Sequence, residues 1–170
     1  KTTFTRDVAP ILFANCVGCH RPGEVAPMAL RTYEEARPWA KSIKKMVSAR
    51  LMPPWFADPT HGEFANDARL TEEQISTLVR WADLDAPEGD KSDLPPLPDF
   101  TEGWALGEPD YIIPLPEVQV PAEGSDYFPD LSVTVDIPED QWVRAVEVRP
   151  GNRQVNHHVV LFSSSGAGMG

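Results

Sequence analysis

The chain has 170 residues, 41% of them hydrophobic and 24% charged, which is ordinary for a globular protein and allows one medium domain or two small ones. Its formal charge is −11, and only the segment 31–50 is locally basic. This balance argues against nucleic acid as a partner, because binding phosphates requires a basic footprint over the whole domain. No apolar run approaches the length of a membrane-spanning helix, and no signal peptide is visible, so we expect no membrane span.

The first expected element is a helix that starts near Thr5 and runs up to residue 15. Apolar residues such as Val8 and Leu12 recur at helical rather than alternating spacing. Thr5 is the expected N-cap, with Asp7 in the first turn. A helix, not a strand, therefore leads into the next motif.

That motif, NCVGCH, holds both cysteines of the chain, Cys16 and Cys19, with His20 directly after the second. A thioredoxin-like redox pair would need a βαβ context, and a structural zinc site would need two more ligands from the distant His61, His157 or His158. Covalent haem c attachment needs this pentad alone, because two thiols add to neighbouring vinyl groups and the next residue lies under the iron. The spacing therefore favours haem c with His20 as proximal ligand, and two free buried thiols beside a surface histidine are the alternative.

Two further helices are expected in the first ninety residues. Residues 32–50 follow a possible capping box of Thr32 and Glu35 and end before two consecutive prolines. Residues 71–86 show the clearest pattern, with a second capping box, Thr71 and Gln74, and a proline stop. These helices would surround the haem.

The second axial position of an electron-transfer haem is normally filled. Met52 is the expected ligand, because it follows a helix long enough to reach the far face and precedes two stiffening prolines; the alternative role is gap filling beside the porphyrin. His61 is the fallback ligand. The other candidates are Met28, Met46 and Met169, and aromatic side chains are expected to wall the haem: Trp39, Trp55, Phe56 and Trp81.

The composition changes after the third helix. Residues 91–103 are rich in charge and proline and are expected to form a linker. Beyond it, residues 104–170 contain short β-branched or aromatic runs with alternation, which predicts a β module of the sandwich type. This module ends in a small-residue tail, SSSGAGMG, so we expect it to be truncated from a longer chain.

Residues 4–90 resemble the class I cytochrome c family through CVGCH, the Met-Pro turn and the last helix, LTEEQISTLVRWADLDAP. The resemblance implies an all-α fold with crossing first and last helices, thioethers at Cys16 and Cys19, and His20 and Met52 as axial ligands. The segment between His20 and Met52 is short for the larger members, which indicates a compact bacterial type. Haem c is attached outside the cytoplasm in bacteria, so a periplasmic or extracellular location is expected.

The stretch WVRAVEVRPGNRQVNHHVVLF is similar to the start of the copper type II ascorbate-dependent monooxygenase family. In that family the histidine pair helps bind one copper, which implies His157 and His158 as copper ligands. The family's remaining ligands have no counterpart in this sequence. Adjacent side chains on a strand point to opposite faces, so the alternative is one core and one surface histidine.

The sequence thus predicts an α+β chain in two parts, an all-α cytochrome c fold followed by an antiparallel β-sandwich-type module. The expected function is that of a monohaem c-type cytochrome that transfers single electrons to a redox partner protein or a fused copper domain. One alternative is the electron-donor portion of a larger copper-dependent monooxygenase. A further alternative is a haem sensor or peroxidase with an open iron site.

Overall fold

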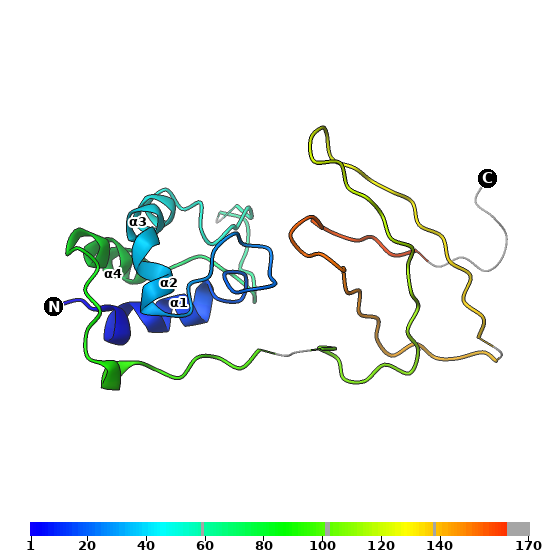
Figure 1. Cartoon of the computed structure of the whole chain (residues 1–170), viewed down its shortest axis with the longest axis horizontal. Helices are drawn as coiled ribbons and strands as arrows, with labels where there is room; N and C mark the ends of the chain where they lie inside the picture. Colours follow the sequence, from blue (N-terminus) through cyan, green and yellow to red (C-terminus); the bar gives the residue numbers. More distant parts are fainter. Residues whose placement is uncertain (59, 101–102, 138, 163–170) are drawn as a thin grey trace. The chain divides into compact units, whose positions relative to one another are not determined.

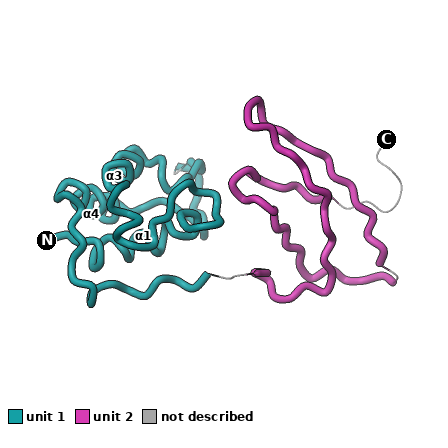
Figure 2. Tube along the Cα trace, in the orientation of Figure 1, with its two compact units in different colours: residues 1–100 teal, residues 101–170 magenta. Residues whose placement is uncertain are grey.

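The computed structural model describes residues 1–58, 60–100, 103–137 and 139–162. Contacts divide the chain into two compact units, unit 1 at Lys1–Phe100 and unit 2 at Thr101–Gly170 (Figure 2). The boundary falls inside the segment expected to be a linker. Within the described residues, no helix is both long enough and apolar enough to span a membrane.

Unit 1 begins with a π-helix, η1 (Phe4–Val8), that continues directly into α1 (Ala9–Asn15). The N-cap is Thr3 rather than Thr5, so the prediction for the cap was wrong, and Thr5 is buried. The Asp7 carboxylate accepts a hydrogen bond from the Thr3 backbone N–H at 2.8 Å, which takes the place of a side-chain cap. The prediction of a helix leading into the cysteine motif is confirmed.

The single helix expected over 32–50 is divided into α2 (Tyr33–Ala36), a 3₁₀ turn η2 (Arg37–Trp39) and α3 (Ala40–Ser48). Pro38 lies in the 3₁₀ turn. A proline has no N–H to donate and its ring crowds the preceding turn, so a regular α-helix is interrupted there.

The expected capping box of α2 is only half formed. The Thr32 hydroxyl accepts from the Glu35 backbone N–H at 3.2 Å, as predicted. The Glu35 carboxylate bonds instead to the Arg31 backbone N–H at 2.8 Å and to the Arg31 guanidinium at 2.7 Å. The acidic side chain thus extends the cap by one residue toward the amino terminus.

Helix α4 (Glu72–Asp83) carries the complete capping box predicted for it. Thr71 N–H donates to the Gln74 side chain at 2.9 Å, and Gln74 N–H donates to the Thr71 hydroxyl at 3.2 Å. The helix stops where the backbone enters the left-handed region at Asp85 and Ala86, with φ of 61° and 50°. A short 3₁₀ turn, η3 (Lys91–Asp93), follows.

The core of unit 1 forms where these helices meet (Figure 1). The Phe4 ring lies 5.6 Å from the Tyr33 ring and 6.0 Å from the Trp81 ring, measured between centroids. Trp81 is fully buried, and its indole N–H donates to the Pro87 carbonyl at 3.0 Å. The amino-terminal helix and α4 therefore pack through aromatic side chains.

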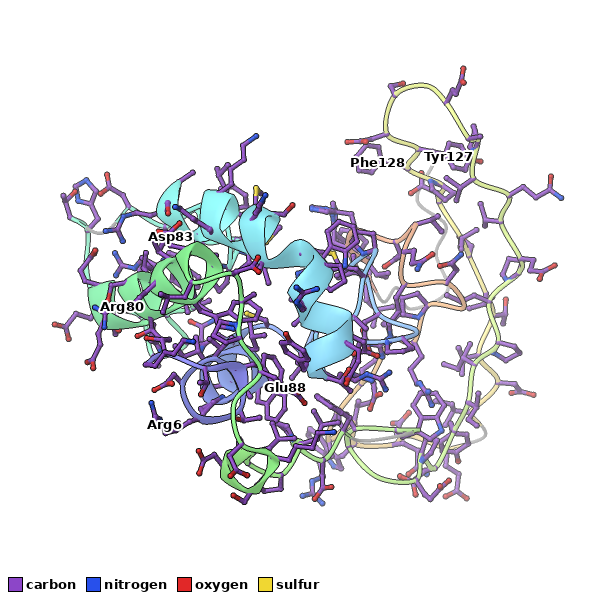
Figure 3. All side chains as sticks on the ribbon, turned by 60° about the vertical axis from the view of Figure 1, so that its left-hand side comes forward. Arg6, Arg80, Asp83, Glu88, Tyr127 and Phe128 are labelled. Carbon is purple, nitrogen blue, oxygen red and sulfur yellow. The ribbon has the colours of Figure 1, made fainter. Side chains whose placement is uncertain are left out.

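The segment after α4 returns to the amino terminus and closes the unit. Phe4 N–H donates to the Pro87 carbonyl and Thr5 N–H to the Glu88 carbonyl, both at 2.9 Å. Figure 3 shows the segment that carries Glu88 passing beside the first helix. Gly89 has φ of +97°, and a Cβ there would lie 2.4 Å from the Thr5 hydroxyl oxygen, so the close approach requires glycine.

Unit 2 corrects the predicted fold class. The described residues 103–137 and 139–162 contain no β-strand, so the expected β-sandwich-type module is wrong. The backbone is extended there (Figure 1), but a strand also needs a ladder of backbone hydrogen bonds between neighbours. Two long-range bonds among the described residues of unit 2 end instead on a side chain: the Glu147 carboxylate accepts from the Ala105 and Leu106 backbone N–H groups at 3.1 and 3.0 Å.

The alternating pattern in unit 2 does not produce a buried face either. None of the described residues of unit 2 is buried. Trp142 is fully exposed, and Leu106 retains 65% of its accessible surface. Alternation in the sequence therefore specifies an extended backbone but not the partner that would cover its apolar side.

Candidate functional site

The cysteine motif forms a tight loop at the end of α1. The Cys16 carbonyl accepts hydrogen bonds from both the Cys19 N–H at 3.1 Å and the His20 N–H at 2.8 Å. Val17 between them is fully buried and anchors the loop in the core. Both cysteines are free thiols, with Cys16 half-buried and Cys19 exposed. One carbonyl therefore fixes the backbone turn that carries the two thiols and the imidazole.

The His20 ring is oriented by a backbone carbonyl. Its Nδ1 lies 3.2 Å from the Met28 carbonyl oxygen. A carbonyl can only accept, so Nδ1 carries the proton and the neutral ring keeps its lone pair on Nε2. Metal-ligating histidines usually donate their other ring N–H in this way, which fixes the tautomer and the ring orientation. In this orientation Nε2 of His20 is the ring nitrogen that could bind a metal.

The segment that provides the carbonyl is itself fixed. Leu30 N–H donates to the His20 carbonyl at 3.0 Å, and Ala26 N–H donates to the Cys19 carbonyl at 3.3 Å. Met28 packs partly buried against the core. The role of Met28 was not predicted, because it acts through its backbone and no side-chain pattern reveals it.

The buried environment of the Cys16 thiol disfavours its thiolate form. Burial raises the pKa of the Cys16 thiol to about 12, and the nearby Cys19 adds to the shift. Redox-active and zinc-binding cysteines instead have a lowered pKa, because the thiolate is the reactive and ligating form. A helix also leads into the motif, and no strand occurs in the described part of unit 1. The thioredoxin-like interpretation therefore has no support.

Met52 lies in an apolar and partly exposed stretch after α3. Its side chain is 37% exposed, and Leu51 at 59% and Phe56 at 96% are exposed beside it. Trp55 contacts Phe64 edge-on, with ring centroids 5.5 Å apart. Exposed apolar side chains gathered in one stretch are typical of a surface that binds an apolar group.

The loops that carry the two expected axial ligands occupy different sides of unit 1. In Figure 1 the segment that follows the cysteine motif lies nearer the viewer than the fainter segment that follows α3, and Figure 3, turned by 60°, shows the two apart.

Two buried side-chain nitrogens of the described residues lack a hydrogen-bond partner: Arg21 Nε and Trp55 Nε1. Arg21 follows His20 directly, and Trp55 follows Met52 by three residues. Buried donors without acceptors are rare in folded proteins. Both residues are close in sequence to the expected axial ligands.

The remaining candidates of unit 1 lie elsewhere in that unit. Met46 lies within α3, and the His61 side chain is 83% exposed, with Nε2 3.9 Å from an Asp58 oxygen. Trp81 belongs to the core, whereas Trp39 is 41% exposed. Met169 is outside the described residues.

His157 and His158 meet on the same side of the backbone in unit 2. Their Nδ1 atoms are 2.9 Å apart, their ring centroids are 5.2 Å apart, and both residues are exposed. The argument that adjacent side chains face opposite ways assumed a strand, and this segment is not one. Among the residues that the structure describes, no group of three His, Cys, Asp or Glu side chains is arranged to hold a metal ion.

Comparison with known proteins identified no relative of this chain. No family model, no curated protein and no solved structure matches this chain. The resemblances to cytochrome c and to copper monooxygenases therefore stay predictions that depend on the motifs alone.

Proposed function

We propose that unit 1 is a monohaem c-type cytochrome domain that transfers single electrons. The observation that carries this proposal is the His20 ring, whose Nδ1 lies against the Met28 carbonyl and whose Nε2 is left to bind iron. The two free thiols in the turn before it stand at the spacing that haem c attachment requires. The unpaired indole nitrogen of Trp55 adds a polar group that the chain alone does not satisfy.

The residues present fit haem c. Cys16 and Cys19 would form the two thioethers, and His20 and Met52 would bind the iron. The bound haem would supply a one-electron couple. The Met28 carbonyl keeps the His20 ring in one orientation, and the buried Val17 keeps the motif on the core. Ligands that are fixed in this way would move little when the iron changes its oxidation state, and such a small rearrangement favours fast electron transfer.

This proposal extends to location and partners. Covalent haem attachment occurs outside the cytoplasm in bacteria, so we place the protein in the periplasm or outside the cell. Its acidic balance, with a charge of −11, suits a basic redox partner, because complementary charge accelerates association.

The deciding experiment is intact mass together with iron and copper content on the chain expressed with haem maturation. We expect one iron and a covalent mass increase of one haem, and this mass increase should be lost in the Cys16→Ala/Cys19→Ala variant. Iron that is absent from the unsubstituted protein contradicts the proposal. A haem that remains covalently attached after the double substitution contradicts the assignment of the thioethers.

Met52 is tested separately by carbon monoxide binding to the reduced protein. The unsubstituted protein should not bind the gas, whereas Met52→Ala should bind it because the iron loses a ligand. Met46→Ala is the matched control and should behave like the unsubstituted protein. Binding by the unsubstituted protein would favour the haem sensor or peroxidase instead.

One observation favours a second function, the electron-donor portion of a copper-dependent monooxygenase. The Nδ1 atoms of His157 and His158 are 2.9 Å apart. Two imidazole nitrogens that bind one metal at about 2.0–2.1 Å and about 90° to each other have a separation of about this size. The chain would then supply two copper ligands. Because the expected β-sandwich is absent from the described residues, this histidine pair is the main support for the second function.

Copper titration tests the second function. One copper per chain in the unsubstituted protein, and none in His157→Ala or His158→Ala, would support it. His61→Ala is the matched control, because that histidine is exposed and belongs to unit 1. An equal response of all three variants would reduce the pair to surface histidines.

A further inference from the structure

A cleft of about 230 Å³ opens in unit 1 where the first helix, α2 and the segment after α4 meet. It combines an apolar surface with charged side chains. Its lining includes the apolar residues Phe4, Tyr33 and Leu94 and the charged residues Arg31, Glu34, Glu88 and Lys91. We call it the Glu34–Glu88 cleft, and it contains no residue of the candidate haem site.

The walls of the Glu34–Glu88 cleft are held by hydrogen bonds between distant segments. The backbone N–H and the hydroxyl of Thr5 both donate to the Glu88 carbonyl, at 2.9 and 3.2 Å. The Tyr33 hydroxyl donates to the Ala86 carbonyl at 2.9 Å. A cleft that is already fixed in this way loses little conformational freedom when a ligand enters, which favours binding.

The charges that line the cleft are not balanced. The Arg31 guanidinium is compensated by Glu35, because the two side chains are joined at 2.7 Å. Two carboxylates of the lining, Glu34 and Glu88, then stand against the single ammonium of Lys91. This ammonium is 3.9 Å from the Glu88 carboxylate, which is beyond hydrogen-bond distance, and the Lys91 side chain is 82% exposed. One carboxylate is in excess, so the cleft favours a cation over an anion.

Glu34 is held in its charged form. Hydrogen bonds from its own backbone N–H and from the Thr32 hydroxyl lower the pKa of the Glu34 carboxyl, and the charge of Lys91 adds to this shift. The Lys91 ammonium thus acts on both carboxylates, although it forms no hydrogen bond with Glu88. A cation near Glu34 and Glu88 is therefore stabilised by two opposite charges.

We propose that the Glu34–Glu88 cleft binds a small organic cation in which a primary ammonium group is joined to an apolar body. The ammonium would take the place of Lys91 and donate directly to the Glu88 carboxylate, while the exposed Lys91 side chain moves into solvent. The apolar body would cover Leu94, which is 42% exposed, beside Tyr33.

The size of the cleft limits the apolar body. A cavity of about 150 Å³ holds benzene, so about 230 Å³ accommodates one aromatic ring with a short ammonium arm. Phenethylammonium has this composition and is the probe for the experiments. Because the cleft shares no residue with the candidate haem site, this proposal does not rest on the proposed function.

The first test is a titration of the whole ¹⁵N-labelled chain, expressed with haem maturation, with phenethylammonium. We expect saturable chemical-shift changes at the amides of Tyr33, Glu34 and Glu88 and an unchanged haem absorption spectrum. The control compound is 3-phenylpropanoate, which has a similar shape and the opposite charge and should bind at least about fivefold more weakly. Equal binding of the two compounds, absence of saturable binding, or shift changes confined to other parts of the chain would overturn the proposal.

Two substitutions with opposite expected effects test the role of the charges. Glu88→Gln should weaken the binding of phenethylammonium roughly fivefold, the upper range for a partly exposed ion pair. It leaves in place the backbone carbonyl that bonds to Thr5. Lys91→Met removes the competing ammonium but keeps an unbranched side chain, and it should strengthen binding roughly twofold.

Glu73→Gln is the matched control, because it removes the same charge at an exposed position of α4 outside the cleft. Its affinity for phenethylammonium should equal that of the unsubstituted protein. A Glu88→Gln variant that binds as tightly as this control overturns the proposal, and so does a Lys91→Met variant that binds no more tightly than the unsubstituted protein.

Discussion

The two units of this chain start from similar apolar content and reach opposite results. Unit 1 buries an aromatic and aliphatic core around Phe4, Leu78 and Trp81. Unit 2 leaves its apolar side chains exposed and has no strand in its described residues. A helix satisfies its backbone groups internally and needs only one covered stripe, whereas an extended segment needs a neighbour for both its backbone and its face.

The largest expected effect is in hydrogen exchange, which compares the two units directly. Backbone amides in α1 and α4 should exchange at least about 10³-fold more slowly than those of residues 131–137, because the helical amides are bonded in a packed core. After exchange the chain is digested, and mass spectrometry of the peptides measures both regions in one sample. Equal protection would mean that unit 2 contains a backbone ladder and would remove the contrast.

A matched pair of leucines sharpens the comparison. Leu78→Ala removes a fully buried side chain from α4 and should lower the free energy of unfolding by about 2–5 kcal/mol. Leu106→Ala changes a residue of unit 2 that is 65% exposed and should shift it by less than about 0.5 kcal/mol. Denaturant unfolding followed by the helical circular dichroism signal measures both. A comparable loss from Leu106→Ala would mean that this exposed side chain contributes to the stability that the helical signal measures.

A pair of glycines separates backbone strain from close packing. Gly89→Ala places a Cβ against Thr5 in a left-handed conformation and should cost roughly 2 kcal/mol in the same unfolding experiment. Gly107 has a φ of +93°, but no atom lies within 4 Å of the place that a Cβ would occupy. Gly107→Ala should therefore leave the helical transition unchanged. Tolerance of alanine at both positions would contradict the tight closure between the amino terminus and residue 89.

The smallest expected effect concerns pH. The hydrogen bond from Arg31 holds the pKa of the Glu35 carboxyl below its ordinary value of 4.5, although burial opposes the shift. Because the folded pKa is the lower one, this stabilisation is present above about pH 4.5 and is lost as the pH falls through the folded value. Glu35→Gln should cost at most about 1 kcal/mol at pH 7, since the pair is partly exposed.

Unfolding curves at pH 7 and at pH 3 measure this contribution. The difference between Glu35→Gln and the unsubstituted protein should shrink at the lower pH. Glu123→Gln, an exposed position of unit 2, is the control and should show no difference at either pH. A constant difference at both values would mean that the carboxylate charge of Glu35 contributes nothing.

Local signals in the sequence predicted local structure well. The capping box of Thr71 and Gln74 formed with both bonds, and the helix before Cys16 is present. Such signals succeed because the groups that satisfy each other are three or four residues apart. The start of the first helix was misplaced from Thr3 to Thr5, because both threonines suit a cap and the choice depends on the distant Glu88 carbonyl.

The candidate site also has some features that the sequence predicted and others that it did not. The sequence by itself determined the motif of Cys16, Cys19 and His20, because its chemistry depends on a fixed spacing along the chain. Only the tertiary structure revealed that the Met28 carbonyl orients the His20 ring and that Trp55 Nε1 lacks a partner. A carbonyl is present at every residue and an indole at every tryptophan, so their roles depend on which groups the fold brings near them.

The absence of strand pairing in the described residues of unit 2 shows most clearly what the sequence alone does not determine. Alternating residues determined an extended backbone there, which is a property of each segment alone. Whether extended segments join into a sheet depends on register and partners distant in the chain, and the tertiary structure placed the Glu147 carboxylate, not a neighbouring strand, at the Ala105 and Leu106 amides. Short-range chemistry was thus determined by sequence, and every pairing between distant segments was decided by the fold.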